Sequence, residues 1–230
     1  MKPQAANPDA AKPLSSTQRA LRELREMIFA GELPAGSQHL ESELAERLGM
    51  SRTPVREAAL TLESQGLLEM RPRKGVRILP VSPGDMLEIY DVFTELESLA
   101  ARRAAERAYS AEELTRLAST IEHMDRALDL EDLESWAAAD EAFHAELVRL
   151  GGNSRVQSIV GMMSDQVRRA RSVTLYMRPR PIKSNQDHRQ VFDAIRDGKP
   201  EAAAEIHRAH RRAAKELIVS LLEKHKLHMI

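Results

Sequence analysis

Four side chains that could bind one metal ion together are spread over the second half of the sequence. Asp140 and His144 lie four residues apart, a spacing that puts both on one face of a helix. His188 and His210 follow in later segments with helical periodicity, and antiparallel packing could place them opposite this pair. Three imidazoles and one carboxylate suit Zn²⁺, or Ni²⁺ or another borderline divalent cation.

Spacing alone leaves other roles open for these residues. The sequence contains eight histidines, so some clustering arises by chance. His207 lies one helical turn before His210 and is a competing ligand. A metal-dependent enzyme could use the same four residues. However, the sequence has no His-Glu-x-x-His motif, and Glu141 points about 100° away from Asp140 around a helix. Catalysis is therefore the weaker alternative.

A second group of side chains, in the first third of the sequence, suits contact with nucleic acid. Ser51, Arg52, Thr53 and Arg56 fall at the start of a predicted helix. Arginine pairs with guanine through two hydrogen bonds, while hydroxyl groups and helix N-termini hold phosphate. The alternative for the arginines is a solvated helix face.

A basic run follows at Arg71-Pro72-Arg73-Lys74-Gly75-Val76-Arg77, with four cations and no acid. Such a run is a candidate phosphate-contact patch. For Arg71 and Arg77, an exposed strand edge is an equal alternative.

The elements that must position the first group follow from periodicity and turn signals. A helix is predicted from Ser16, a second over 41–48, and a third after Ser51, where Ser51 is placed to cap it. Gly49 suits the turn between the last two helices because glycine readily takes a positive φ. The apolar residues expected to lock these two helices together are Leu44, Leu48, Val55 and Leu62. The runs 67–70 and 75–79 predict a small β-hairpin.

The remaining sequence predicts helices only. Six amphipathic segments are separated by turn signals, at 84–108, 111–128, 131–150, 154–178, 184–197 and 199–225. The fold class is therefore mainly α: a winged helix-turn-helix of three helices and a small β-hairpin, followed by an all-helical bundle. The predicted domains are a disordered arm over 1–14, a DNA-binding domain over 15–80 and a helical domain over 81–230.

Composition agrees with this organisation. Apolar residues make up 42% and charged residues 30% of the 230 positions, enough to form a core in each half. Aromatic residues reach only 3% and cysteine is absent, which excludes disulfides and thiolate metal sites. Without a signal peptide or a stretch of about 18 apolar residues, the chain is expected to be cytoplasmic, with no membrane partner.

The segment 44–58, together with 62–67, resembles the winged-helix signature of GntR-family regulators, and the resemblance covers residues 16–80. It implies that Arg52, Thr53 and Arg56 approach bases and backbone of double-stranded DNA. It also implies that a wing tip near Arg73, Lys74 and Gly75 enters the adjacent minor groove. A position that is often arginine in relatives is Ser42 here, which argues against a base contact from that point.

Residues 84–225 resemble the FCD-type sensor domain of the FadR subfamily, a bundle of six or seven helices. The resemblance implies a divalent metal bound by Asp140, His144, His188 and His210. His210 is favoured over His207 because Arg211-Arg212-Ala213 follows it as in relatives. It further implies an effector, a small carboxylate or sugar acid, whose oxygen atoms complete the coordination of the metal.

One position departs from that pattern. Many relatives carry an arginine where this chain has Phe93, so a cationic clamp for a carboxylate is missing there. Arg102, Arg103 or Arg168 would have to replace it, or the ligand is less acidic. Together the two resemblances imply a homodimeric, ligand-responsive transcription regulator and not an enzyme. We expect a repressor that a small organic acid releases from its operator.

Overall fold

The computed structural model describes residues 14–225, and the chain divides into two compact units, residues 1–79 and 80–230. The arm predicted over residues 1–14 lies, except for its last residue, outside the described residues. No helix in the described part of the chain is long and apolar enough to span a membrane.

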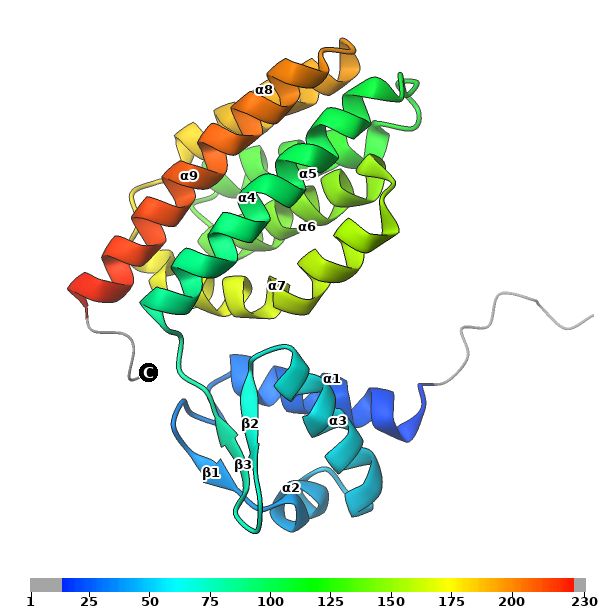
Figure 1. Cartoon of the computed structure of the whole chain (residues 1–230). Helices are drawn as coiled ribbons and strands as arrows, with labels where there is room; N and C mark the ends of the chain where they lie inside the picture. The colour runs from blue at the N-terminus through cyan, green and yellow to red at the C-terminus, as the bar shows by residue number, and fades with distance from the viewer. Residues whose placement is uncertain (1–13, 226–230) are drawn as a thin grey trace, which may run out of the picture. The chain divides into compact units, whose positions relative to one another are not determined.

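The first unit is a winged helix-turn-helix (Figure 1). Its helices are α1 (Ser16–Phe29), α2 (Glu41–Arg47) and α3 (Arg52–Ser64), and its strands are β1 (Gln38–His39), β2 (Leu68–Arg71) and β3 (Gly75–Ile78). The strands form an antiparallel sheet in the order β1-β3-β2. The sequence predicted only the β2–β3 hairpin. It missed β1 because two residues are too short to show an alternating pattern.

The core of this unit confirms the packing expected between α2 and α3. Leu44, Val55 and Leu62 are completely buried, and Leu48 packs against them from a half-buried position. Gly49 has φ +59°, the left-handed conformation that the turn between the two helices requires. Ser51 occupies the N-cap position of α3 by its backbone, but its hydroxyl makes no capping hydrogen bond with the described residues, contrary to the prediction.

The second unit is a helical bundle whose six predicted α-helices are all present. They are α4 (Pro83–Glu106), α5 (Thr115–Asp129), α6 (Leu133–Gly151), α7 (Ser154–Thr174), α8 (Ile182–Arg196) and α9 (Pro200–Lys224). The helix predicted over 154–178 ends at Thr174 and continues as the 3₁₀ turn η1 (Leu175–Met177), since Pro179 and Pro181 follow and the residue before a proline avoids the α conformation.

Helix α4 holds the bundle together, because it lies beside α9 along much of its length and also packs against α6 and α7 (Figure 1). Gly151 at the end of α6 lies so close to α4 that a Cβ atom there would come within 2.7 Å of the Cα of Ala100. The contact pins the end of α6, the helix that carries Asp140 and His144, against α4.

Candidate functional site

The N-terminal end of α3 exposes the side chains predicted to read DNA. Ser51, Arg52, Thr53 and Arg56 are all exposed. Glu41 of α2 pairs with both arginines: its carboxylate lies 3.8 Å from Nη2 of Arg52 and 3.4 Å from Nη1 of Arg56. One carboxylate therefore restrains two guanidinium groups beside a helix N-terminus, which itself attracts phosphate.

The tip of the β2–β3 wing has a backbone that only a few residue types tolerate. Arg73 has φ +63° and Gly75 has φ +78°. A Cβ atom at Gly75 would lie 2.1 Å from the carbonyl oxygen of His39, so the position accepts only glycine. Arg73 and Lys74 are exposed beside it. The wing tip therefore presents two cations on a turn of fixed shape.

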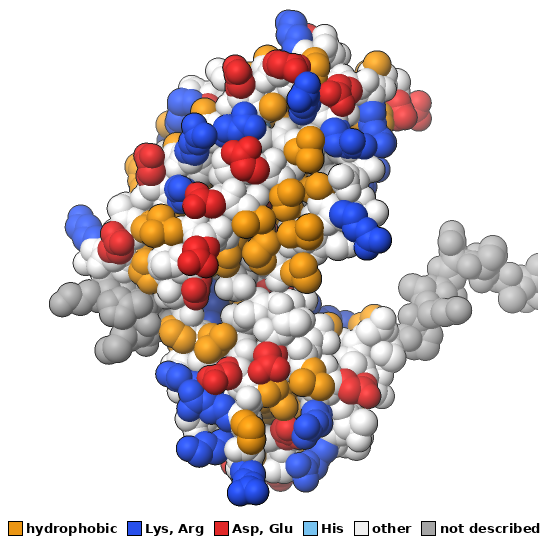
Figure 2. All heavy atoms as spheres, in the orientation of Figure 1, with side chains coloured by type: hydrophobic (Ala, Val, Ile, Leu, Met, Phe, Trp, Pro, Cys, Tyr) orange, Lys and Arg blue, Asp and Glu red, His pale blue; other side chains and the backbone are white. Residues whose placement is uncertain are grey.

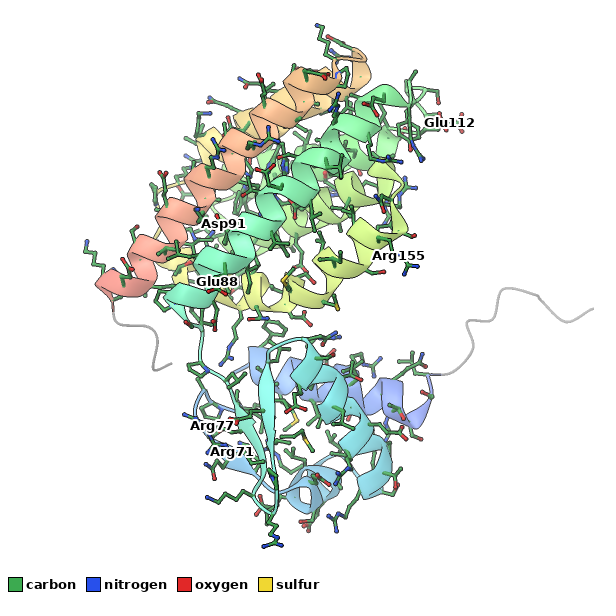
Figure 3. The ribbon with its side chains drawn as sticks, viewed as in Figure 1. Arg71, Arg77, Glu88, Asp91, Glu112 and Arg155 are labelled. Atoms are coloured by element: carbon green, nitrogen blue, oxygen red, sulfur yellow. The ribbon has the colours of Figure 1, made fainter. Side chains whose placement is uncertain are left out.

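One face of the wing sheet carries two further arginines. In the sheet, Glu69 lies opposite Arg77 and two residues from Arg71, so the three side chains share one face (Figure 3). Nε and Nη2 of Arg71 each donate a hydrogen bond of 3.1 Å to Oε2 of Glu69. Part of the hydrogen-bonding capacity of Arg71 is thus used inside the wing.

In the second unit, the four residues predicted as metal ligands come together from three helices. His144 of α6, His188 of α8 and His210 of α9 place one ring nitrogen each within 4.8 Å of one another. Asp140, one turn before His144, has Oδ1 at 3.6 Å from Nε2 of His188 and Oδ2 at 3.8 Å from Nε2 of His144. All four side chains are buried.

Several polar atoms of this cluster lack a hydrogen-bond partner among residues 14–225: Oδ2 of Asp140, Nε2 of His144, and both ring nitrogens of His188. Leaving buried polar atoms unpaired costs about 1–3 kcal/mol each, so folded proteins avoid it unless a ligand satisfies them. Oδ2 of Asp140 does form an ion pair with Arg171 of α7. The unpaired Nε2 atoms of His188 and His144 have carboxylate oxygens of Asp140 at 3.6 and 3.8 Å, beyond hydrogen-bond distance.

A second, neighbouring cluster contains His207, the competing ligand. Its Nε2 lies 3.4 Å from Oε2 of Glu97, and its Nδ1 lies 3.4 Å from the hydroxyl of Ser98. Glu97 also lies 3.1 Å from Nδ1 of His144 and forms a buried ion pair with Arg211. Both nitrogens of His207 thus have protein partners, which leaves it less available to a metal than His188.

A carboxylate lies beside the Nδ1 atom of each of the other two histidines. Nδ1 of His144 faces Glu97, and Nδ1 of His210 lies 3.6 Å from Oδ2 of Asp187. At His144, a carboxylate that accepts from Nδ1–H directs the lone pair of Nε2 the other way, which is the usual arrangement around metal-binding histidines. At His210 the distance corresponds to an ion pair and not to a hydrogen bond. The role of Glu97 is not apparent from the sequence, because Glu97 lies 47 positions before His144.

Burial keeps these histidines neutral. Burial, joined by the charge of Arg211, holds the pKa of His144 well below 6.5, although Glu97 opposes this. Burial and the neighbouring His210 do the same to the pKa of His188. Burial lowers the pKa of His210 to about 4. Neutral imidazoles are the form that binds metal, so the cluster is ready for a cation at neutral pH.

Two cavities adjoin the cluster. The larger, of about 560 Å³, is lined by Phe93, Glu97 and residues of α6 and α7. The smaller, of about 220 Å³, is lined by residues of η1, α8 and α9 together with Asp140 and Tyr90. The side chains that line both are His144, Arg171, Leu175 and Arg211.

Of the three arginines expected near this region, Arg168 lines a cavity, and Arg171 and Arg211 add positive charge to both cavities. Arg102 pairs with Glu106 and Glu201, and Arg103 donates to the carbonyl of Gly151, so neither lines the two cavities. Arg168 lines the larger cavity and pairs with Glu141 at 3.5 Å. The guanidinium of Arg211 lies 5.7 Å from the centre of the Phe93 ring. The positive charge of Arg211 therefore lies close to Phe93, the position where the resemblance implies an arginine in many relatives.

Comparison with known proteins bears on both units. Residues 16–78 match the bacterial regulatory proteins of the gntR family, and residues 88–213 match the FCD domain. An HTH-type transcriptional regulator in the TAR-I ttuE-ttuC' intergenic region of Agrobacterium vitis is 42% identical over 142 residues, which are 61% of this chain and 83% of that protein. A protein of Paenarthrobacter nicotinovorans, named as a D-xylose utilization operon transcriptional repressor, is 32% identical over 188 residues, 76% of each chain.

The solved structure of E. coli McbR/YncC has the same fold, with a TM-score of 0.74 over 90% of this chain and 98% of that chain, at 20% identity. These matches confirm the fold class and the family that the sequence motifs indicated, and they give no support to the enzyme alternative. The chain belongs to the GntR family of bacterial regulatory proteins and carries an FCD domain, and it is a ligand-responsive, DNA-binding transcription regulator.

Proposed function

We propose that this regulator senses a small organic acid through a divalent metal ion, of which Zn²⁺ is the best candidate, held by Asp140, His144, His188 and His210. The observation that carries the proposal is the set of buried, unpaired nitrogens of His144 and His188 within the described residues. Three neutral imidazoles with one carboxylate are a donor set suited to zinc or nickel. One ring nitrogen from each of the three histidines lies within 4.8 Å of the others, so small side-chain rotations would bring all three to one ion.

The metal would supply a Lewis acid that accepts oxygen atoms of the effector. The residues of the chain do the rest: Glu97 and Asp187 orient the histidines, and Arg171 and Arg211 bring positive charge to both cavities. Nickel or another borderline divalent ion would fit the same donors.

We further infer that the protein is a repressor. The relative from P. nicotinovorans is named as an operon repressor, and a Bacillus subtilis relative, 28% identical over 187 residues, is named gluconate operon transcriptional repressor. Gluconate is a sugar acid, and sugar acids and small carboxylates carry the oxygen donors that a hard or borderline cation accepts. Both names support a repressor, and the gluconate name supports a sugar acid as effector, whereas D-xylose is a neutral sugar.

A homodimer is the expected form because helix-turn-helix proteins read two half-sites with two-fold symmetry. Helices α4 and α7 present an exposed hydrophobic surface that suits a second copy (Figure 2). The large apolar side chains exposed on it are Val92 and Leu99 of α4 and Ile159 and Met162 of α7. Contiguous apolar surface of this kind marks an interaction site.

Charges at the two ends of this surface favour pairing with its own copy. Helices α4 and α7 run antiparallel, since the end of α4 packs with the start of α7 at Ala100 and Val156, and the start of α4 clusters with the end of α7 at Ile89 and Ala170. Glu88 therefore lies near one end of the surface and Arg155 near the other (Figure 3). Both side chains are exposed. A two-fold axis through the middle of the surface brings Glu88 of each copy to Arg155 of the other.

A binding titration tests this function. The DNA is a fluorescent duplex from the promoter beside the gene of the protein, and the anisotropy is measured with protein as purified, after chelation, and after addition of one equivalent of Zn²⁺. We expect salt-sensitive binding of the promoter over a scrambled duplex by a factor of about 10³ or more. We also expect gluconate or succinate to weaken it only when zinc is present. Binding without sequence preference would contradict the operator function, and release that ignores zinc would contradict the sensor.

A further inference from the structure

The smaller cavity has an excess of positive charge. The cations that line it are Arg171, Arg178, Arg180, Lys183 and Arg211, against the carboxylates Asp140 and Asp187. Three of these cations have acidic partners: Arg171 pairs with Asp140, Lys183 with Asp187, and Arg211 with Glu97.

The other two cations have none among residues 14–225. Nη2 of Arg178 donates to the carbonyl of Arg171 at 2.7 Å and to Oγ1 of Thr174 at 2.6 Å. Nη2 of Arg180 donates to the carbonyl of Leu128 at 2.6 Å. These are neutral acceptors, so two full positive charges at the cavity stay uncompensated. Arg180 is exposed, so water solvates its charge, whereas Arg178 is partly buried. A partly buried guanidinium without a counter-ion favours an anion nearby.

An unpaired hydroxyl lies in the same cavity. Tyr90 of α4 is completely buried and lines the cavity, and its Oη has no hydrogen-bond partner in the range 14–225. A buried tyrosine hydroxyl normally finds a partner. The guanidinium carbon of Arg211 lies 5.8 Å from the Tyr90 ring centre, which keeps positive charge beside this donor.

We propose that the smaller cavity binds a small aliphatic dicarboxylate, one carboxylate of which accepts hydrogen bonds from Tyr90, Arg171 and Arg178 while the other reaches the histidine cluster. Its position supports this, because Asp140, His144 and His210 line the same cavity. The volume of about 220 Å³ is below that of typical drug-sized ligand sites, so the ligand is compact. This proposal rests on the proposed sensor function and names its ligand class and the residues that select it.

Arg171 suits the role although it already pairs with Asp140. Its guanidinium stays protonated at neutral pH, as arginine does in folded proteins. Its guanidinium has five N–H donors in a planar fork, more than one carboxylate accepts. It can therefore bridge Asp140 and an incoming acid.

Titration calorimetry on the full-length, zinc-loaded protein tests the proposal with two probes of equal chain length, succinate and butyrate. Succinate should bind at least tenfold more tightly than butyrate. Because a hydrogen bond to a charged group contributes about 1.5–3 kcal/mol, Tyr90→Phe should weaken succinate binding by about tenfold or more. Arg178→Met should remove most of the preference for succinate. Tyr176→Phe is the matched control, because Tyr176 lines the larger cavity only and should change nothing.

The melting temperatures of the variants distinguish a loss of ligand binding from a loss of folding stability. Removing a hydroxyl that has no partner within the described residues should leave the melting temperature of Tyr90→Phe unchanged or raised. Equal binding of succinate and butyrate, or unchanged succinate affinity in both Tyr90→Phe and Arg178→Met, would overturn the dicarboxylate site. If the same preparations hold zinc and bind the promoter, the proposed function survives that result. If they hold no zinc, the sensor proposal itself fails.

Discussion

Nδ1 of His144 lies 3.1 Å from Oε2 of Glu97, and both side chains are buried, from helices α6 and α4. Although burial alone would raise the pKa of Glu97, Arg211 and His144 hold it well below 4.5, so the carboxylate is charged. It then accepts the proton of Nδ1 and leaves Nε2 of His144 free to bind a metal.

This contact predicts that a second substitution can restore the folding stability lost at Glu97 without restoring the zinc affinity. Glu97→Gln leaves the buried Arg211 without a counter-ion and should cost about 3–5 kcal/mol of folding free energy. The double variant Glu97→Gln/Arg211→Met removes both charges and should recover most of that loss. Both variants should bind zinc about 10–100 times more weakly, by competition with a chromophoric chelator. Glu95→Gln is the control, because Glu95 is exposed and pairs with Arg208. Full zinc affinity in the double variant would show that Glu97 acts only through Arg211.

The histidine cluster predicts a pH dependence for the metal-free protein. Above pH 6.5 the histidines are neutral in both the folded and unfolded chain and add no pH dependence. Below pH 6.5, His144, His188 and His210 become protonated in the unfolded chain, while burial keeps them neutral in the folded chain. The free energy of unfolding therefore falls with pH. For His210 this continues to a pH of about 4. Each group lowers the free energy by up to about 1.4 kcal/mol per pH unit.

Thermal melts of chelator-treated protein between pH 7.5 and 5 measure this effect above the range where carboxylates titrate. The melting temperature should fall with pH, and His188→Gln should reduce the slope. His123→Gln, a change at an exposed histidine of α5, should not. A melting temperature that stays constant down to pH 5 contradicts the depressed pKa values.

The wing tip predicts a glycine-specific defect. Gly75→Ala meets both a positive φ and a backbone oxygen at 2.1 Å, and should destabilise the first unit by about 2 kcal/mol or more. Promoter affinity should fall as the wing distorts. Gly161→Ala is the control: it lies within α7 with open space around it and should be neutral or stabilise by roughly 0.5–1 kcal/mol. Equal melting temperatures for the two variants would refute the close approach of Gly75 to His39.

The helix and the wing should contribute differently to DNA binding. Arg56→Ala should weaken the specific promoter complex by about 1–3 kcal/mol and relax sequence preference. Lys74→Ala should weaken specific and random DNA alike and reduce the slope of log affinity against log salt by about 1. Arg22→Ala, an exposed residue of α1 paired with Glu26, is the control. Anisotropy titrations at three salt concentrations separate these cases, and identical behaviour of Arg56→Ala and Lys74→Ala would contradict the assignment of base reading to α3.

The proposed two-fold surface predicts a charge-swap experiment. Glu88→Arg places four like charges at the contacts with Arg155 in a dimer, and Arg155→Glu does the same with the opposite sign. Each single variant should shift the dimer toward monomer in analytical ultracentrifugation, and the double variant should restore it. Glu112→Arg, at the far end of the bundle, is the control (Figure 3). Unchanged association in both single variants would place the dimer contact elsewhere.

The fold was predictable because its signals are local. Helical periodicity located all six helices of the second unit, and the errors lie at ends where short-range bonds decide, as where the hydroxyl of Ser110 accepts from the backbone N–H of Glu113 and α5 begins only at Thr115. Strand β1 has too few residues to carry a pattern.

The candidate site was predictable only in part. Asp140 and His144 are close in sequence, and resemblance supplied His188 and His210. Their supporting residues come from distant positions: Arg211 meets Glu97 across 114 residues. Arg171 and Tyr90 also line the smaller cavity. Each lies in an amphipathic helix, where the sequence alone predicts an ordinary surface or core residue. Whether a buried polar atom lacks a hydrogen-bond partner depends on three-dimensional packing and cannot be predicted from the spacing of residues in the sequence.

The metal content of the purified protein tests the central claim most directly. Mass spectrometry of the metals in dialysed wild-type protein should find about one divalent ion per chain. His188→Ala and His144→Ala should lose it, while His123→Ala should keep it because His123 is exposed on α5 and outside the cluster. Wild-type protein that stays metal-free after incubation with Zn²⁺ and dialysis, or a His188→Ala variant that retains a full equivalent, would contradict the account.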